Sequence, residues 1–201
     1  AARLLQPTIG YVRVAEFADS TPAALRQAAA QLQREGARAL VLDLRGTARG
    51  PFEAGIESAR PFVPSGTLAI LESRGEARRT VSAASGDGDV TLPLAVLTDF
   101  GTAGAAELFV AALTGNKRAE TVGERSQGRA ALQRLFPLPD GGSLWMSHAW
   151  YLTPAGTAIH ERGLQPDVPV TQPDVEFGTP PPAGDPSLEK AVERLAGRLP
   201  S

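Results

Sequence analysis

The residues that could carry chemistry in this chain are few, and their types already exclude several reactions. The sequence contains no cysteine and two histidines, His148 and His160. Without cysteine there is no thiolate nucleophile, no thiolate metal site and no disulfide. Two histidines cannot build a three-histidine zinc site. We therefore expect no metal ion and no other cofactor.

The elements that must position any site follow an alternating pattern in the first half of the chain. Residues 9–14 alternate and are rich in β-branched side chains, which predicts a strand. Helix signals run from the hydroxyl and proline residues at 20–22 to Gly36. Residues 39–44 are almost wholly apolar, which is typical of a strand buried on both faces of a parallel sheet. The opening is therefore a strand–helix–strand unit.

The second half is predicted to be richer in strands. We expect helices over 52–60 and 103–113, and strands over 68–73, 78–82, 94–97, 120–123, 133–138 and 143–152. The turn at 140–142 has the composition of a hairpin. A linker rich in proline and glycine at 178–184 then leads to a short helix at 188–195. We expect a core domain over 1–173 and a linker with its helix over 174–201.

Net charge and hydropathy argue against nucleic acid and against a membrane span. The formal net charge is −2, which gives no electrostatic reason to bind nucleic acid. No run of 18 or more apolar residues exists, so we expect no membrane-spanning segment. The chain begins at Ala1, which leaves open a removed leader or an excised fragment.

Seven short segments, in chain order, resemble the core of C-terminal processing (tail-specific) serine proteases. They lie at residues 9–14, 42–45, 101–107, 123–129, 137–142, 153–156 and 163–167, and the tail at 185–191 also fits. Each segment alone is weak, but their order over nearly the whole chain is specific. The resemblance implies an α/β fold with a crotonase/Clp-protease-like ββα core, a mixed sheet flanked by helices and a β-rich second half. We expect the PDZ domain usual in that family to be missing, either absent or cut off, because the resemblance begins near the start of the chain.

The resemblance also implies where a catalytic pair would lie. The family's serine nucleophile falls on Gly104 and its lysine base on Arg129, separated by the family's spacing (129 − 104 = 25). The glutamine that supports the lysine falls on Gln133. Glycine cannot attack a carbonyl, and an arginine side chain, with an ordinary pKa of about 12.5 or higher, cannot serve as a general base. Both halves of the pair are therefore replaced.

The oxyanion-hole positions implied by the resemblance are Arg49, Gly50 and Ala105. Arg49 stands where relatives have one glycine of a pair, and it would resist a left-handed backbone. Ala105 can still offer its N–H group.

Several side chains near these positions have alternative interpretations. Arg129, with Thr102 and Gln127, could bind a peptide, the guanidinium holding its terminal carboxylate; alternatively Arg129 is a solvated or ion-paired replacement. Thr102 or Ser126 could be a displaced nucleophile, but neither has a lysine or histidine at a supporting spacing. A serine–histidine pair through His160 is weaker still.

The remaining assignments near the site are structural. Glu107 is expected on the helix surface or as a cap, His148 on a strand face and His160 in a loop. Trp145 is expected to pack within a sheet.

The sequence therefore predicts a catalytically inactive homologue that binds peptide or protein C-terminal segments or regulates an active relative. Association with such a relative or with a second copy fits this role. The alternative is an active serine-type endopeptidase with a non-standard catalytic set. A third hypothesis, an acyl-thioester enzyme, rests on fold analogy alone and has no phosphate-binding glycine motif behind it. By family analogy we expect a location outside the cytoplasm, in the periplasm or cell envelope.

Overall fold

The centre of the molecule is a six-stranded mixed sheet. The computed structural model describes residues 1–6, 8–171 and 184–199. The strands of this sheet, in spatial order, are β1 (Ala2–Gln6), β2 (Ile9–Arg13), β3 (Ala39–Asp43), β6 (Leu94–Thr98), β7 (Ala119–Gly123) and β10 (Val168–Pro169). β1 is antiparallel to β2, and every other neighbouring pair is parallel. A parallel centre requires crossover helices, which the chain supplies.

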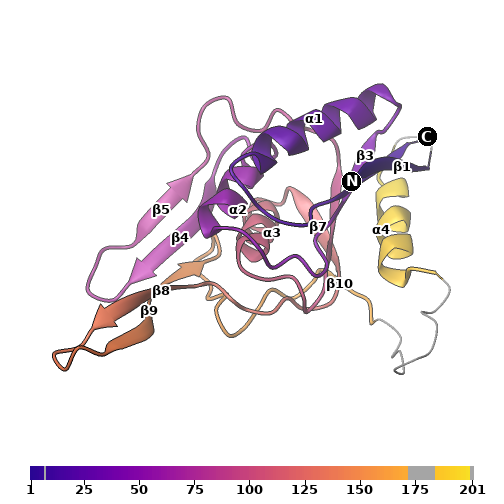
Figure 1. Ribbon diagram of the computed structural model, residues 1–201. Helices are drawn as coiled ribbons and strands as arrows, with labels where there is room; N and C mark the ends of the chain where they lie inside the picture. The colour runs from indigo at the N-terminus through magenta and orange to yellow at the C-terminus, as the bar shows by residue number, and fades with distance from the viewer. Residues whose placement is uncertain (7, 172–183, 200–201) are drawn as a thin grey trace.

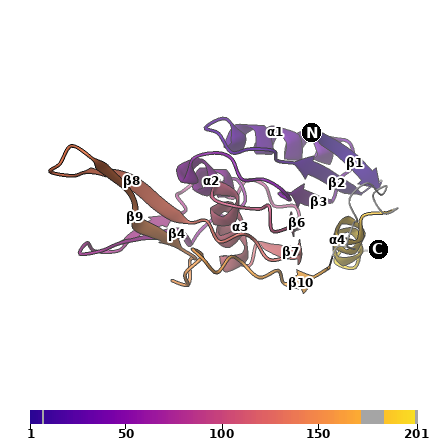
Figure 2. The same cartoon turned by 60° about the horizontal axis from the view of Figure 1, so that its bottom comes forward.

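Helices cover both faces of this sheet, which explains why its central strands are almost wholly apolar. On one face Leu40 and Leu42 of β3 pack into a cluster with α1 (Thr21–Arg34), α2 (Phe52–Ala59) and α3 (Ala105–Gly115). On the other face Ala39 and Val41 pack against α4 (Pro186–Ala196). Figure 2 shows α4 on the opposite side of the sheet from the other three helices. The prediction of a strand buried on both faces is confirmed.

A second sheet, of four antiparallel strands, extends from the part of the molecule that contains the six-stranded sheet. Its strands, in spatial order, are β5 (Arg79–Ser82), β4 (Thr67–Ser73), β9 (Ser143–Leu152) and β8 (Ala131–Pro137). The β8–β9 hairpin projects as an arm away from the six-stranded sheet in both ribbon views (Figures 1 and 2). The mixed α/β class with a β-rich second half is therefore confirmed.

The structure differs from the sequence-based predictions at the start of α1 and in two strands. Ser20 makes no side-chain capping bond at the start of α1; Thr21 Oγ1 instead accepts a hydrogen bond from the Ala18 N–H at 2.9 Å. β1 and β10 were not predicted, because one is a partly exposed edge strand and the other is two residues long.

The predicted division between 1–173 and 174–201 stays a prediction. Most of the expected linker lies outside the described residues. Within the described ranges, no helix is long and apolar enough to cross a bilayer.

Candidate functional site

The turn between β6 and α3 has a backbone conformation that favours glycine. Gly104 is the residue before α3, and its φ of 63° and ψ of −120° lie outside the regions that side chains readily adopt. A Cβ atom built on Gly104 would lie 3.5 Å from its nearest neighbour, Arg129 Nη2. The turn therefore has room for a small side chain that this chain lacks.

Glu107 joins this turn to the segment that carries Arg129. Its side chain is fully buried. Oε2 accepts hydrogen bonds from the N–H groups of Gly104 (3.0 Å) and Arg129 (2.7 Å). Oε1 accepts from Ser126 Oγ and from the Gly128 N–H, both at 2.6 Å. Four donors around one carboxylate offset its burial and fix the two segments against each other. The capping role expected for Glu107 is present, and the surface position is wrong.

The Arg129 side chain lies across the mouth of the turn. Its Nη2 atom is close to Gly104 and donates a hydrogen bond to the carbonyl oxygen of Ala48. The side chain is exposed, and no carboxylate among the described residues lies within ion-pair distance of it. A cation with further N–H donors therefore faces solvent at the site.

These groups line a pocket of about 480 Å³. Its lining residues come from the loop after β3, the start of α2, the turn before α3, the loop before β8, strands β8 and β9, and the loop before β10. They are Gly50, Phe52, Gly104, Arg129, Ala131, Leu132, Gln133, Trp145 and His160. Four positions singled out from the sequence therefore meet in one cavity: Gly50, Gly104, Arg129 and Gln133.

The other four positions singled out from the sequence do not line this pocket. Arg49 and Ala105 are neighbours of lining residues in the chain. Thr102 is buried, and its Oγ1 lies 3.0 Å from the Leu44 carbonyl oxygen and accepts from the Asp99 N–H at 3.1 Å. Gln127 is exposed, and its N–H donates to the Thr102 carbonyl at 3.0 Å. These two residues hold the turn, so a peptide-binding role for them remains a prediction.

Five lining residues were not among the site positions predicted from the sequence, and two of these, Trp145 and His160, carry polar groups. Trp145 lies on the strand opposite Gln133 and donates its indole N–H to Gln133 Oε1 at 2.7 Å. The Nδ1 atom of His160 is buried and has no hydrogen-bond partner among the described residues. The two-residue alternation back from the 140–142 turn would have placed Trp145 on the face of Gln133. No local signal marks His160.

The loop between β3 and α2 forms the opposite wall. Gly50 has a φ of 119°, and an added Cβ would lie 2.1 Å from the Phe17 carbonyl oxygen, so this position requires glycine. Arg49 is not among the described residues with positive φ, and its carbonyl accepts a hydrogen bond from the Phe17 N–H at 3.0 Å. The left-handed conformation in this loop therefore falls on Gly50 and leaves Arg49 unstrained.

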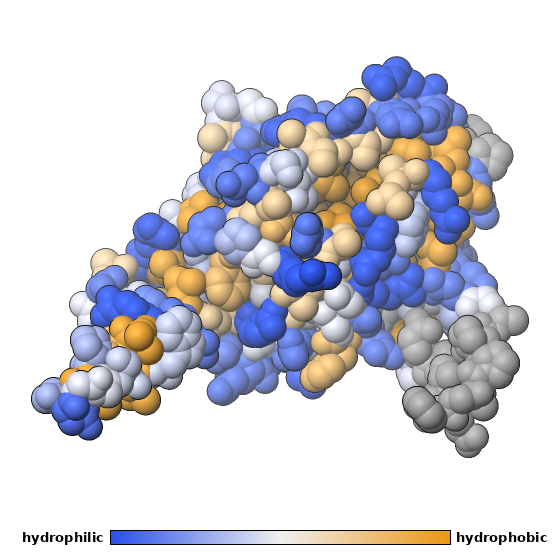
Figure 3. Space-filling model, viewed as in Figure 1, coloured by the Kyte–Doolittle hydropathy of each residue, from blue (hydrophilic) through white to orange (hydrophobic). Residues whose placement is uncertain are grey.

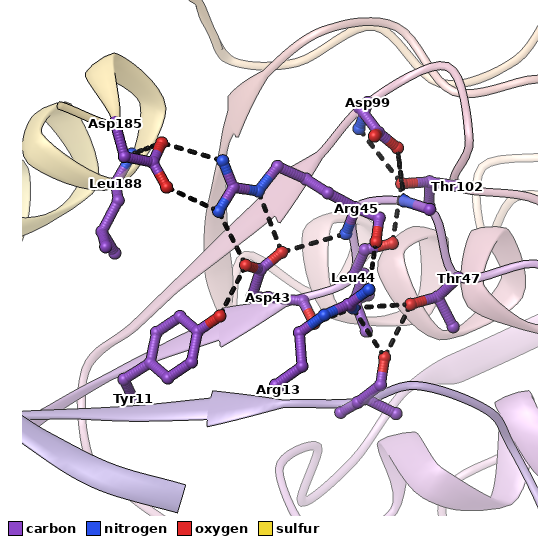
Figure 4. A network of polar contacts seen from close by, with 12 residues as sticks. Tyr11, Arg13, Asp43, Leu44, Arg45, Thr47, Asp99, Thr102, Asp185 and Leu188 are labelled. Carbon is purple, nitrogen blue, oxygen red and sulfur yellow. Dashed lines mark hydrogen bonds and ion pairs between the residues drawn. The ribbon is translucent and has the colours of Figure 1, made fainter. Parts of the chain in front are cut away.

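The base of this loop is held by the ion-pair network in Figure 4. Arg45 pairs with Asp43 at 2.7 Å and with Asp185, the residue before α4, at 2.8 Å. Tyr11 donates its hydroxyl to Asp43 Oδ2 at 2.7 Å. The network thus ties β2, the end of β3 and the start of α4 together beside the site.

This network shifts the pKa values of its members. Burial raises the pKa of Tyr11 to about 12, and the hydrogen bond to Asp43 adds to the effect. Burial alone would raise the pKa of Asp43, but the hydrogen bonds from Arg45 and Tyr11 outweigh it and hold that pKa below its ordinary value. The hydrogen bond to Asp43 likewise raises the pKa of Arg45. The ion pair between Asp43 and Arg45 therefore persists at neutral pH.

Comparison with known proteins gives the family. Residues 8–170 match the model of peptidase family S41. The chain belongs to this family. It is 34% identical over 190 residues to a carboxyl-terminal-processing protease of Synechocystis sp., covering 94% of this chain and 44% of that protein. It is 39% identical over 160 residues to the chloroplastic C-terminal processing peptidase of Tetradesmus obliquus, covering 80% of this chain and 34% of that one.

Solved structures agree with this assignment. A photosystem II D1 C-terminal processing protease is 39% identical, with a TM-score of 0.73 over 81% of this chain and 42% of that chain. A peptidase structure from Parabacteroides merdae, 20% identical, has a TM-score of 0.81 over all of this chain and 66% of that chain, which supports the fold alone. The chain spans less than half the length of the two curated relatives.

Proposed function

We propose that this chain binds extended C-terminal segments of peptides or proteins in the Gly104–Arg129 pocket and does not cleave them. The observation that carries the proposal is the state of the turn before α3: its strained geometry and its buried Glu107 are retained, while the residue at its apex is glycine. A peptidase of this family without a nucleophilic side chain keeps a peptide site but has no group to form an acyl intermediate.

The state of the alternative nucleophiles and of the lysines supports this proposal. The hydroxyls of Thr102 and Ser126 are buried and engaged in hydrogen bonds within the turn. The chain contains two lysines, Lys117 and Lys190; the first lines a different pocket and the second pairs with Glu193 in α4. A displaced Ser–Lys pair therefore has no support among these residues.

Arg129 gives the pocket an anion-binding group. A guanidinium can hold a carboxylate through two parallel N–H···O bonds. Among the described residues, the Arg129 guanidinium donates to the Ala48 carbonyl and to no other acceptor. The edge of strand β8 begins two residues later and can pair with an extended chain by strand addition. A peptide terminus bound by Arg129 would thus continue along β8.

The proposal also covers where in the cell the protein works. Two of the relatives are named as chloroplastic processing enzymes, and others come from bacteria. By analogy with such processing proteases, we propose that this chain works outside the cytoplasm, alone or beside an active relative.

A restoration experiment tests the loss of activity. The unmodified chain and the double variant Gly104→Ser/Arg129→Lys are incubated with an unstructured protein substrate, and cleavage is followed by mass spectrometry. We expect no cleavage by the unmodified chain. If it cleaves, and Thr102→Ala abolishes the cleavage, the chain is an active peptidase with a non-standard catalytic set and the proposal is wrong.

A binding experiment tests the role of Arg129. Labelled peptides with a free terminal carboxylate are compared with the same peptides amidated, by fluorescence anisotropy. We expect low-micromolar binding of the free acid, at least tenfold weaker binding of the amide, and the same loss for Arg129→Gln. Arg3→Gln, an exposed arginine stacked on Tyr11, is the control. Equal binding of acid and amide would exclude a carboxylate clamp.

A further inference from the structure

The β8–β9 hairpin carries most of the large hydrophobic side chains that are exposed on the described part of the chain. Of six large hydrophobic side chains exposed there, five lie between residues 135 and 146: Leu135, Leu138, Leu144, Trp145 and Met146. Trp145 is 61% exposed. In the space-filling view, the projecting arm shows hydrophobic residues among hydrophilic ones (Figure 3). Such a concentration on one projecting element marks an interaction surface.

The strand register divides these side chains between the two faces of the hairpin. Leu135 is opposite Trp145, and Trp145 bonds to Gln133, so these three share one face. Leu144 is opposite Phe136 and Met146 is opposite Arg134, which places them on the other face. We call the face of Gln133, Leu135 and Trp145 the inner face.

The inner face is continuous with the Gly104–Arg129 pocket. Gln133 and Trp145 line that pocket, while none of Leu144, Met146 and Phe136 does. The indole is held in place by its bond to Gln133, so its orientation toward the pocket is fixed before anything binds. A ligand that fills the pocket and extends outward therefore reaches Trp145 and then Leu135.

Strand β8 offers the backbone that such a ligand needs. It is the last strand of its sheet in the described structure, pairs with β9 alone, and contributes Ala131, Leu132 and Gln133 to the pocket. β8 runs outward from Arg129, so a peptide whose carboxyl end lies at Arg129 would run antiparallel to it. In an antiparallel pair, directly opposed residues share a face, so alternate ligand side chains would meet the inner face.

We propose that the inner face is a second subsite, which binds an apolar side chain of the same extended peptide whose terminal carboxylate Arg129 holds. This inference rests on the proposed function. Leu135 is six positions beyond Arg129 (135 − 129 = 6). At about 3.4 Å per residue in both strands, the apolar residue lies about four to six positions before the carboxyl end of the peptide.

The test uses short labelled peptides of glycine, serine and threonine with a free terminal carboxylate, in which one leucine is moved along the sequence. We expect leucine at about four to six positions before the end to tighten binding roughly tenfold over the peptide without leucine. Leu135→Ala, at a residue outside the pocket lining, should remove this gain and leave binding of the leucine-free peptide unchanged. Trp145→Ala should remove the gain as well. Trp145→Phe should retain most of it.

Matched controls come from the opposite face. Leu144→Ala and Met146→Ala remove equally exposed apolar side chains and should preserve the leucine gain. Thermal unfolding of every variant checks that the fold is intact.

Three outcomes would overturn the inference. A leucine gain that survives Leu135→Ala and Trp145→Ala means that the inner face does not contact the peptide. A change in sedimentation behaviour in these variants, without a change in peptide affinity, means that a second copy of the chain covers the face. Binding that depends on Arg129 but not on leucine at any position would contradict this inference and leave the proposed function intact. Failure of every peptide to bind would contradict both.

Discussion

At Gly104 the backbone conformation and the absence of a side chain have separate consequences. The conformation is held by Glu107, whose carboxylate accepts the Gly104 N–H, so the surroundings can impose it on another residue. A side chain at a positive φ costs about 1–3 kcal/mol when the surroundings impose the conformation. A serine there is therefore strained but sterically possible, since its Cβ would meet nothing closer than 3.5 Å.

Three glycine-to-serine variants test how much stability a serine at position 104 costs. Gly104→Ser and Gly75→Ser should each lower the free energy of unfolding by about 1–2 kcal/mol, because both have positive φ and neither meets a close contact. Gly50→Ser should cost more than about 3 kcal/mol, because its Cβ would overlap the Phe17 carbonyl oxygen. Urea unfolding measures all three. A Gly104→Ser loss as large as that of Gly50→Ser would mean that the turn cannot accommodate a nucleophile.

The raised pKa values of the two tyrosines lead to a second prediction, on how stability depends on pH. Burial first, and then Asp43 beside Tyr11 and Glu53 beside Tyr151, raise the pKa of each to about 12. The folded state therefore binds the phenolic proton more tightly than the unfolded chain, whose tyrosines titrate near 10. Stability from both groups is fully present below pH about 10 and is lost as pH rises from about 10 to about 12.

Ultraviolet absorbance of tyrosinate against pH checks this directly. Both groups should titrate near pH 12 in the folded chain, and Tyr11→Phe and Tyr151→Phe assign each step. A step near pH 10 in the folded protein would mean that the corresponding hydroxyl is solvated.

At the scale of elements, the start of α4 depends on one carboxylate with two roles. Asp185 accepts the Leu188 N–H at 3.1 Å as an N-cap and binds Arg45 through two hydrogen bonds at 2.8 Å. Asp185→Ala should lower the free energy of unfolding by about 1–2 kcal/mol, since it removes the cap and one partner of Arg45. Asp185→Asn keeps an oxygen for the cap and should lose less.

Thermal unfolding monitored by circular dichroism measures these losses. Glu193→Ala, which removes an exposed ion pair within the same helix, should change stability by less than about 0.5–1 kcal/mol and serves as the control. An equal loss in Asp185→Ala and Glu193→Ala would show that the network in Figure 4 contributes little.

The elements themselves were largely predictable from the sequence, because their signals are local. The apolar run that became β3 and the glycine and aspartate turn between β8 and β9 need no knowledge of distant residues. The positions of Gly104, Arg129 and Gln133 followed from family motifs at fixed spacing, and these residues meet in one pocket.

What the sequence did not reveal depends on contacts between distant segments. The surface position considered for Glu107 was wrong because its donors at 126, 128 and 129 reach it only once β7 has paired with β6. His160 enters the pocket from a loop with no periodic pattern. The partner of Asp185 is Arg45, which is distant in the sequence and next to it in the fold.

At the scale of the whole molecule, the six-stranded sheet is complete only when α4 covers its second face. Ala191 and Leu195 of α4 pack with Ile9, Val41 and Leu97, and this cluster is separate from the one beneath α1, α2 and α3. Strands β2, β3 and β6 contribute to both clusters. Loss of α4 from one face should therefore destabilise the strands that position the pocket on the other face.

A matched pair of leucine variants tests this dependence. Leu195 is 1% exposed, so Leu195→Ala should lower the free energy of unfolding by about 2–5 kcal/mol and the midpoint by roughly 5–15 °C. Leu144→Ala, the same change at an exposed position, should alter stability by less than about 0.5 kcal/mol. If the two faces are coupled as the shared strands require, hydrogen exchange in Leu195→Ala should quicken in β3 and β6 as well as in α4. Faster exchange confined to α4 would mean that the helix unfolds alone and that the sheet and its pocket stand without it.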